Sequence, residues 1–269
     1  MKANTFYSST VAVFSSRHIP SFGLYLALAI IGSLLLIGCA SDTSDAAQAP
    51  TTDGQGGSLA RFALKGDYLY TVDDANLNVF SITNGREPVK TNSVSVGFRI
   101  ETLFSYKDYL YIGSRDGMFI YGLERPEFPT QLSSVQHFTA CDPVVANDTH
   151  AFVTLHSETF CGNNINVLEV YDVTDVTNPM LLNSRNLAYP KGLGLYGNYL
   201  FVCDDEIKVF DVTDPTDSQL VTSLNRSAFD VIISNNLLIA IGESGLYQYQ
   251  LSIDADTGVK ATELSTIAI

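Results

Sequence analysis

Charged residues that precede or begin predicted β-strands are the side chains best placed to do chemistry in this sequence. The set consists of Arg99, Glu101, Asp142, Lys191 and Asp230. Two carboxylates held close together can bind a divalent cation, or act as a general acid and a general base. Turns are naturally rich in Asp, so the pattern also fits loops that bind nothing. The five residues are therefore a candidate ligand-binding set, and none is assigned as catalytic.

No known catalytic or cofactor motif accompanies these residues. The sequence has no GxSxG nucleophile elbow, and neither of its Asp-Gly pairs begins an EF-hand loop. No phosphate-binding glycine loop precedes a predicted helix. We therefore expect no cofactor and assign no metal site.

The element that must position the candidate residues is a repeat of about 40 residues. Its first marker is a short apolar and aromatic stretch that opens at Asp67, Asp108, Thr149, Asn198 and Asn236. A second marker, clearest as VYDVTDVTNP at residues 170–179, stays in phase with the first. A period of this length, made of short strands, is typical of β-propeller blades.

The strands can be placed in the second copy of the repeat. Residues 99–106 are predicted as the inner strand, 109–114 and 118–123 as the middle strands, and 130–137 as the outer strand. The same frame gives blades at 58–97, 98–140, 141–190, 191–228 and 229–269. The predicted fold class is all-β, a β-propeller of five four-stranded blades. No strand is left over, so we expect side-chain packing to close the ring, with a terminal strand across the seam as the alternative.

Antiparallel pairing brings two loops of each blade to the same end. These are the loop before the inner strand and the loop between the two middle strands. All five candidate residues fall at this end, which we call the loop end, and propellers commonly bind ligands there.

Two cysteines also fall at the loop end, in the third blade. Cys141 lies before the inner strand and Cys161 lies between the middle strands. Disulfides persist in exported proteins, so we predict a Cys141–Cys161 disulfide. A metal site from these cysteines and His156 is the alternative, although their spacing matches no zinc pattern. Cys203 ends an apolar strand and is predicted to be a buried free thiol.

The N-terminal segment is predicted to be an export signal. Residues 1–38 contain no acidic residue, and the apolar run at 24–37 is short for a bilayer span but suits a signal peptide. The run ends Leu-Ile-Gly before Cys39, which resembles the lipobox of bacterial lipoproteins. The resemblance implies cleavage before Cys39 and lipidation of its thiol, which would make the membrane a partner.

The chain therefore divides into three predicted parts. Residues 1–38 are a lipoprotein signal peptide, 39–57 a lipidated flexible tether without bulky apolar residues, and 58–269 the propeller. An uncleaved N-terminal anchor is the alternative. The expected location is the bacterial cell envelope, and the outer membrane in a Gram-negative host because no Asp follows Cys39 directly.

The second marker also carries a family resemblance. The segments at 170–179 and 209–215 resemble the LVIVD-repeat β-propeller family, which is often found on secreted or lipoprotein bacterial chains. The resemblance covers about residues 58–269. It implies the fold and the compartment, with a structural role for the Asp, Thr and Pro of the loop before the outer strand. The family has no agreed activity, so no catalytic residue is carried over.

The charge composition of the chain argues against one class of partner. The chain has 29 acidic and 15 basic residues and a net charge of −14, which argues against a nucleic-acid partner. The preferred hypothesis is a binding module that offers its loop end to a protein, glycan or small ligand. The alternative is a carboxylate-dependent hydrolase or lyase, which a divalent cation could assist. That alternative requires Glu101, Asp142 and Asp230 to converge in one narrow polar pocket.

Overall fold

The structure, a computed structural model, divides the chain into two units, Met1–Ala49 and Pro50–Ile269. It describes residues 56–136, 143–156 and 165–269. All secondary structure in these ranges is β-strand, and they contain no helix long and apolar enough to cross a membrane. Cys39, Cys141, Asp142 and Cys161 lie outside the described residues, so the predicted lipidation and disulfide stay predictions.

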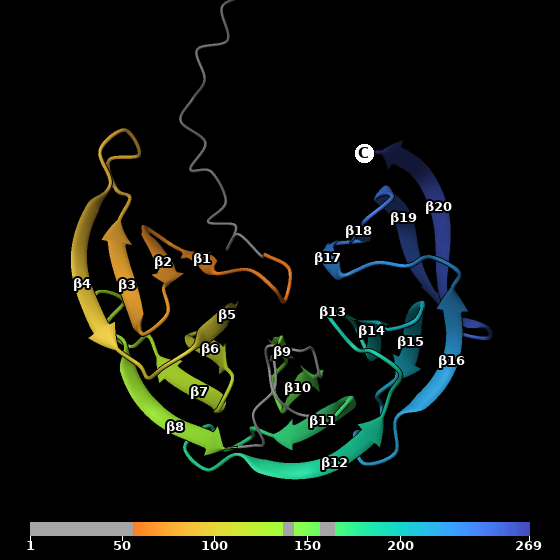
Figure 1. Ribbon diagram of the computed structural model, residues 1–269, viewed down its shortest axis with the longest axis horizontal. Helices are drawn as coiled ribbons and strands as arrows, with labels where there is room; N and C mark the ends of the chain where they lie inside the picture. The colour runs from red at the N-terminus through yellow and green to blue at the C-terminus, as the bar shows by residue number, and fades with distance from the viewer. Residues whose placement is uncertain (1–55, 137–142, 157–164) are drawn as a thin grey trace, which may run out of the picture. The chain divides into compact units, whose positions relative to one another are not determined.

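In the described ranges twenty strands form five four-stranded antiparallel sheets, each in sequence order from the inner to the outer strand (Figure 1). Blade 1 contains β1 (Phe62–Lys65), β2 (Tyr68–Val72), β3 (Asn76–Ser81) and β4 (Val89–Ser95). Blade 2 contains β5 (Ile100–Tyr106), β6 (Tyr109–Ser114), β7 (Gly117–Gly122) and β8 (Thr130–Gln136). Blade 3 contains β9 (Val144–Ala146), β10 (His150–Leu155), β11 (Val167–Asp172) and β12 (Met180–Asn186). Blade 4 contains β13 (Leu193–Tyr196), β14 (Tyr199–Cys203), β15 (Ile207–Asp211) and β16 (Gln219–Leu224). Blade 5 contains β17 (Asp230–Ser234), β18 (Leu237–Gly242), β19 (Gly245–Asp254) and β20 (Gly258–Ala268).

This arrangement confirms the predicted fold class. In blade 2 each strand begins and ends within one residue of its predicted limits. Tight turns join each inner strand to the next strand. Lys107 (φ 49°) and Asn235 (φ 53°) adopt the left-handed conformation where blades 1 and 4 have Gly66 and Gly197. Two-residue hairpin turns require this conformation because it matches the twist of the strands.

The loops that carry the second marker are shaped by their Asp and Thr residues. The carboxylate of Asp175 accepts hydrogen bonds from the backbone N and the hydroxyl of Thr177, at 3.0 and 2.6 Å, and these bonds lower its pKa. Asp214 accepts the same pair of bonds from Thr216 in blade 4. The predicted structural role of the Asp and Thr residues of this segment is therefore confirmed in blades 3 and 4. In blades 1 to 4 a β-bulge follows near the start of the pairing with the outer strand, whereas in blade 5 the bulge lies in the middle of the longer β19–β20 pairing.

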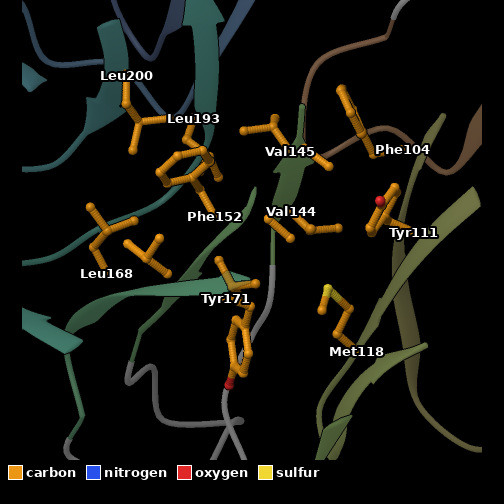
Figure 2. Packing of buried hydrophobic residues seen from close by; sticks show 14 of the residues in the cluster. Phe104, Tyr111, Met118, Val144, Val145, Phe152, Leu168, Tyr171, Leu193 and Leu200 are labelled. Carbon is orange, nitrogen blue, oxygen red and sulfur yellow. The ribbon is translucent and has the colours of Figure 1, made fainter. Parts of the chain in front are cut away.

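The core lies between the blades. One hydrophobic cluster joins blades 1 and 2, a second joins blades 2, 3 and 4, and a third joins blades 4 and 5. Figure 2 shows the second cluster, with Tyr111 and Met118 on one side of β9 and Leu193 and Leu200 on the other. The repeated aromatic and branched residues thus bury both faces of each central blade.

The seam between blades 5 and 1 is different. No hydrophobic cluster of the described residues joins these two blades. Phe62 on β1 is 51% exposed, whereas Leu103, at the same repeat position in blade 2, is 1% exposed. Blade 1 also has Asn78 where blade 2 has Phe119, and Asn78 accepts a hydrogen bond from Lys90 at 2.7 Å. The exposed face of blade 1 is therefore partly polar.

Hydrogen bonds near the centre hold the two sides of this seam together. The segment that precedes β1, residues 56–61, reaches blade 2 through the Ala60 carbonyl, which accepts the Leu103 N–H at 2.7 Å. Its Ser58 hydroxyl donates to Asp230 of blade 5 at 3.1 Å and accepts the Leu193 N–H of blade 4 at 2.8 Å. Among the described residues the seam therefore has neither a shared hydrophobic cluster nor a strand that crosses it, and these hydrogen bonds connect its two sides.

Matched leucine substitutions test the different burial of the two faces. Leu110 is fully buried between blades 1 and 2, and Leu69, its repeat equivalent on the seam side of blade 1, is half-buried. We expect Leu110→Ala to lower the free energy of unfolding by about 2–5 kcal/mol, because it leaves a cavity in a packed interface. Leu69→Ala should cost clearly less. Equilibrium urea denaturation of both variants measures the difference, and equal losses would mean that the seam face is packed like the others.

Candidate functional site

The four described candidate residues all lie at the loop end. Arg99 precedes β5 and Glu101 belongs to it, Lys191 precedes β13, and Asp230 begins β17. Their places in the repeat are therefore as expected, although a role for them in ligand binding stays a prediction.

Asp230 makes its contacts within the protein. Its side chain is buried, and its carboxylate accepts hydrogen bonds from the Ser58 hydroxyl at 3.1 Å, the Val231 N–H at 2.9 Å and the Leu59 N–H at 3.4 Å. A Cβ atom on either Gly57 or Gly192 would overlap this carboxylate, so both glycines allow its close approach. Burial raises the pKa of Asp230 to about 6, against the opposing effect of these bonds. Asp230 therefore fastens the N-terminal segment to blade 5.

Lys191 is also held within the protein. Its ammonium lies 4.8 Å from the centre of the Tyr189 ring, a cation–π contact, and its backbone N–H donates to the Cys203 carbonyl at 2.7 Å. The loop is fixed further by Asp204, whose buried carboxylate accepts the Tyr189 N–H and pairs with Lys208 at 2.7 Å. These contacts shape the loop between blades 3 and 4.

Cys203 is a buried free thiol, as predicted. Burial raises the pKa of the thiol well above its ordinary value, so the reactive thiolate is suppressed. His156 is buried too, and its ring meets the edge of Tyr189 at 5.7 Å between centroids. His150 lies at the opposite end of the same blade, where its ring hydrogen-bonds to Thr149.

The described carboxylates give no support to the hydrolase or lyase alternative. Glu101 pairs with Arg115 at 2.6 Å, whereas Asp230 is held by Ser58 and Leu59. The third acid, Asp142, lies outside the described residues. The part of the chain that the structure describes contains no cluster of three or more His, Cys, Asp or Glu residues that could hold a metal ion.

A small cavity at the loop end does bring charged residues together. It has a volume of about 190 Å³ and is lined by Arg61, Asp74, Arg99, Ile100, Glu101 and Arg115. We call it the arginine cavity. Arg61 donates from Nη2 to the Ile100 carbonyl at 2.9 Å, and Arg115 donates from Nε to Glu101 at 2.6 Å. Two of the three guanidinium groups are thus oriented by bonds to β5.

The backbone beside this cavity departs from the repeat. Glu101 is the extra residue of a β-bulge between Ile100 and Thr102. The other described pairings of an inner strand with its neighbour are regular. Arg99, directly before this bulge, has a φ of 57°. Residues with a Cβ rarely adopt this conformation.

Sequence reasoning missed two residues here. Arg61 precedes the first inner strand much as Arg99 precedes the second, and this position could have revealed it. Phe98, next to Arg99, is 77% exposed. No signal in the sequence distinguished Phe98 from the many phenylalanines that fill the core.

No protein-family model matches this chain, and no curated protein does. Solved structures do match. A protein from Lactobacillus plantarum superposes with a TM-score of 0.61 at 13% identity, over 76% of this chain and 69% of that chain. The Neurospora crassa Pan2 WD40 domain gives 0.54 at 11% identity, over 80% and 66% of the two chains. A component of the Mitotic Checkpoint Complex gives 0.55 at 12% identity, over 75% and 61%.

The fold is that of a β-propeller. At identities this low, the likeness to these propellers shows the fold alone, and the site must be judged from its own residues.

The buried carboxylate of Asp230 makes stability depend on pH. Its folded-state pKa of about 6 lies above the ordinary value of 3.8, so its contribution is present at low pH and is lost as pH rises through 6. Relative to Asp230→Asn, the free energy of unfolding of the wild type should fall by roughly 2 kcal/mol between pH 4 and pH 7. Denaturant unfolding of both proteins across this range measures it. A difference that does not change with pH would refute the assignment, and Asp108→Asn, an exposed change, serves as the control.

Proposed function

We propose that the protein is a lipid-anchored binding module of a bacterial cell envelope, with the loop end as its binding surface. The observation that carries this is the arginine cavity at the loop end, together with the exposed side chain of Phe98, the residue that precedes Arg99 in the chain. Arginine and aromatic side chains are enriched among the residues that dominate binding energy at protein interfaces. The propeller-like component of the Mitotic Checkpoint Complex works within a multi-protein assembly, which also favours a protein partner.

The repeat supports an assignment to the LVIVD-repeat family. Its Asp and Thr residues form the same hydrogen-bonded loop in blades 3 and 4, at Asp175 with Thr177 and at Asp214 with Thr216. This motif builds the fold and carries no chemistry. The assignment therefore supports a location in the cell envelope, and it implies no biochemical activity.

The anchor is proposed from the sequence. Cys39 follows Leu-Ile-Gly at the end of the apolar run, and two or more acyl chains would hold the protein stably on a membrane. The outer membrane is the proposed location in a Gram-negative host. The predicted tether joins the folded unit at Ser58, which lies at the loop end beside Asp230.

Cross-linking in the producing cell tests the binding surface. A photoreactive amino acid replaces Phe98 at the loop end or, as the matched control, Phe128 at the opposite end, which is 47% exposed. We expect a discrete cross-linked product from position 98 and none from position 128. No product from position 98, or equal products from both, would contradict the loop end as the binding surface.

Replacing the lipidated residue tests the anchor. The wild type should incorporate labelled palmitate and remain with the membrane fraction, and Cys39→Ala should lose both properties because no thiol is left to acylate. Cys203→Ala, which removes a buried thiol, is the control and should behave as the wild type. Membrane association of Cys39→Ala without label would instead support an uncleaved anchor.

A further inference from the structure

We propose that the arginine cavity is a carboxylate-binding site, which takes the carboxylate of an acidic residue or of a peptide's C-terminus. The inference names the ligand class of the surface proposed above and so rests on that proposal. It depends on three observations about the cavity: its net charge, the hydrogen bonds and ion pairs of its three guanidinium groups, and the irregular backbone beside it.

The charge of the cavity is opposite to that of the protein. The chain has 15 basic residues and a net charge of −14, yet three arginines line one cavity of about 190 Å³. Asp74 and Glu101 offset two of the three positive charges, which leaves a local charge of about +1. One carboxylate neutralises that charge. A phosphate dianion would leave the cavity negative within an already acidic protein, so a carboxylate is favoured.

The three guanidinium groups differ in their bonding. Arg61 is oriented by the Ile100 carbonyl, and Arg115 is paired with Glu101. Arg99 is exposed, and within the described part of the chain the structure gives its guanidinium no ion pair. A guanidinium can donate two parallel hydrogen bonds to a carboxylate, which fixes the orientation of the ligand as well as its charge. Arg99 is therefore the group that meets the ligand.

Among the described inner strands, only β5 has a β-bulge in its pairing with the next strand, and this bulge lies beside the cavity. Lys107 and Asn235 have a positive φ in hairpin turns that require it, but Arg99 has a φ of 57° at the start of an inner strand. Its carbonyl accepts the Arg115 N–H at 3.2 Å, and the next residue, Ile100, donates to the Asp74 carbonyl at 3.1 Å. Bulges and left-handed residues other than glycine cluster at binding sites, where the strain holds groups in place. Glycine would relieve the strain at position 99 but could not bind a carboxylate.

Titration with small anions tests the site directly. Sodium acetate is added to the purified protein while NMR follows the arginine Nε–H groups, with sodium chloride and sodium phosphate at equal ionic strength as references. We expect saturable shifts of the Arg99 signal with acetate and no saturable shift with chloride. Arg99→Gln should weaken acetate binding about tenfold or more. Arg125→Gln is the matched control. Arg125 contacts the ring of Phe128 at the opposite end of the propeller, so this variant should bind acetate as the wild type does.

Two further variants separate binding from folding. Arg99→Gly should abolish acetate binding while the melting temperature stays equal or rises, because the left-handed conformation suits glycine. Arg99→Lys keeps the charge but loses the paired donors, so its affinity should fall between those of the wild type and Arg99→Gln. Unchanged acetate binding in Arg99→Gly would overturn the proposal, and so would tighter binding of phosphate than of acetate.

Peptides distinguish the two sources of a carboxylate. One arm uses acetyl-Ala-Glu-Ala-amide, which offers only the glutamate carboxylate, and the other uses acetyl-Ala-Ala-Ala with a free C-terminus. Binding of either supports the site, and binding of neither overturns it. The proposed function and the carboxylate site can fail independently. If acetate binds but position 98 gives no cross-linked product, the partner surface is refuted and the carboxylate site is not. If position 98 gives a product but acetate does not bind, the carboxylate site is refuted and the partner surface is not.

Discussion

The packing of one apolar sheet face on the next is the interaction on which the rest of this structure depends. Each central blade is buried on both faces, as Tyr111 and Leu110 show on the two faces of β6. At the seam between blades 1 and 5, no hydrophobic cluster of the described residues joins the two facing sheets. Burial of apolar area drives the packing of the central blades, whereas the partly polar face around Asn78 weakens that drive at the seam.

The seam explains why Asp230, a candidate ligand-binding residue in the sequence, has a structural role. Asp230 begins the last inner strand, where an acidic residue could face a ligand, but the polar donors of Ser58 and Leu59 occupy it. Taking a carboxylate out of water is unfavourable, and this burial raises the pKa of Asp230. The hydrogen bonds to the N-terminal segment offset part of it and join both sides of the seam near the centre.

The sequence was sufficient for the fold because the fold is a repeat. Residues such as Leu110 and Val170 recur in phase, so the strands of blade 2 could be placed to within one residue. The closure could not be predicted, because Ser58 and Asp230 are 172 residues apart and neither belongs to a motif. The same limit applies to Arg61, whose bond to Ile100 spans 39 residues. The periodicity of the sequence predicts which face of a strand is buried, but it does not predict single polar contacts between blades.

The candidate site arises where the repeat is broken. A repeat that satisfied only packing would have the same loop end in every blade, but blade 2 alone among the described blades has a bulge between its inner strand and the next. The bulge adds Glu101, which orients Arg115, and it follows the left-handed Arg99. Stability alone would favour a regular strand with glycine at position 99, so the local structure of blade 2 opposes the regular fold, a conflict that is typical of functional sites. The departure from regularity therefore separates these residues from the Asp-rich turns of the other blades, which packing and turn geometry explain fully.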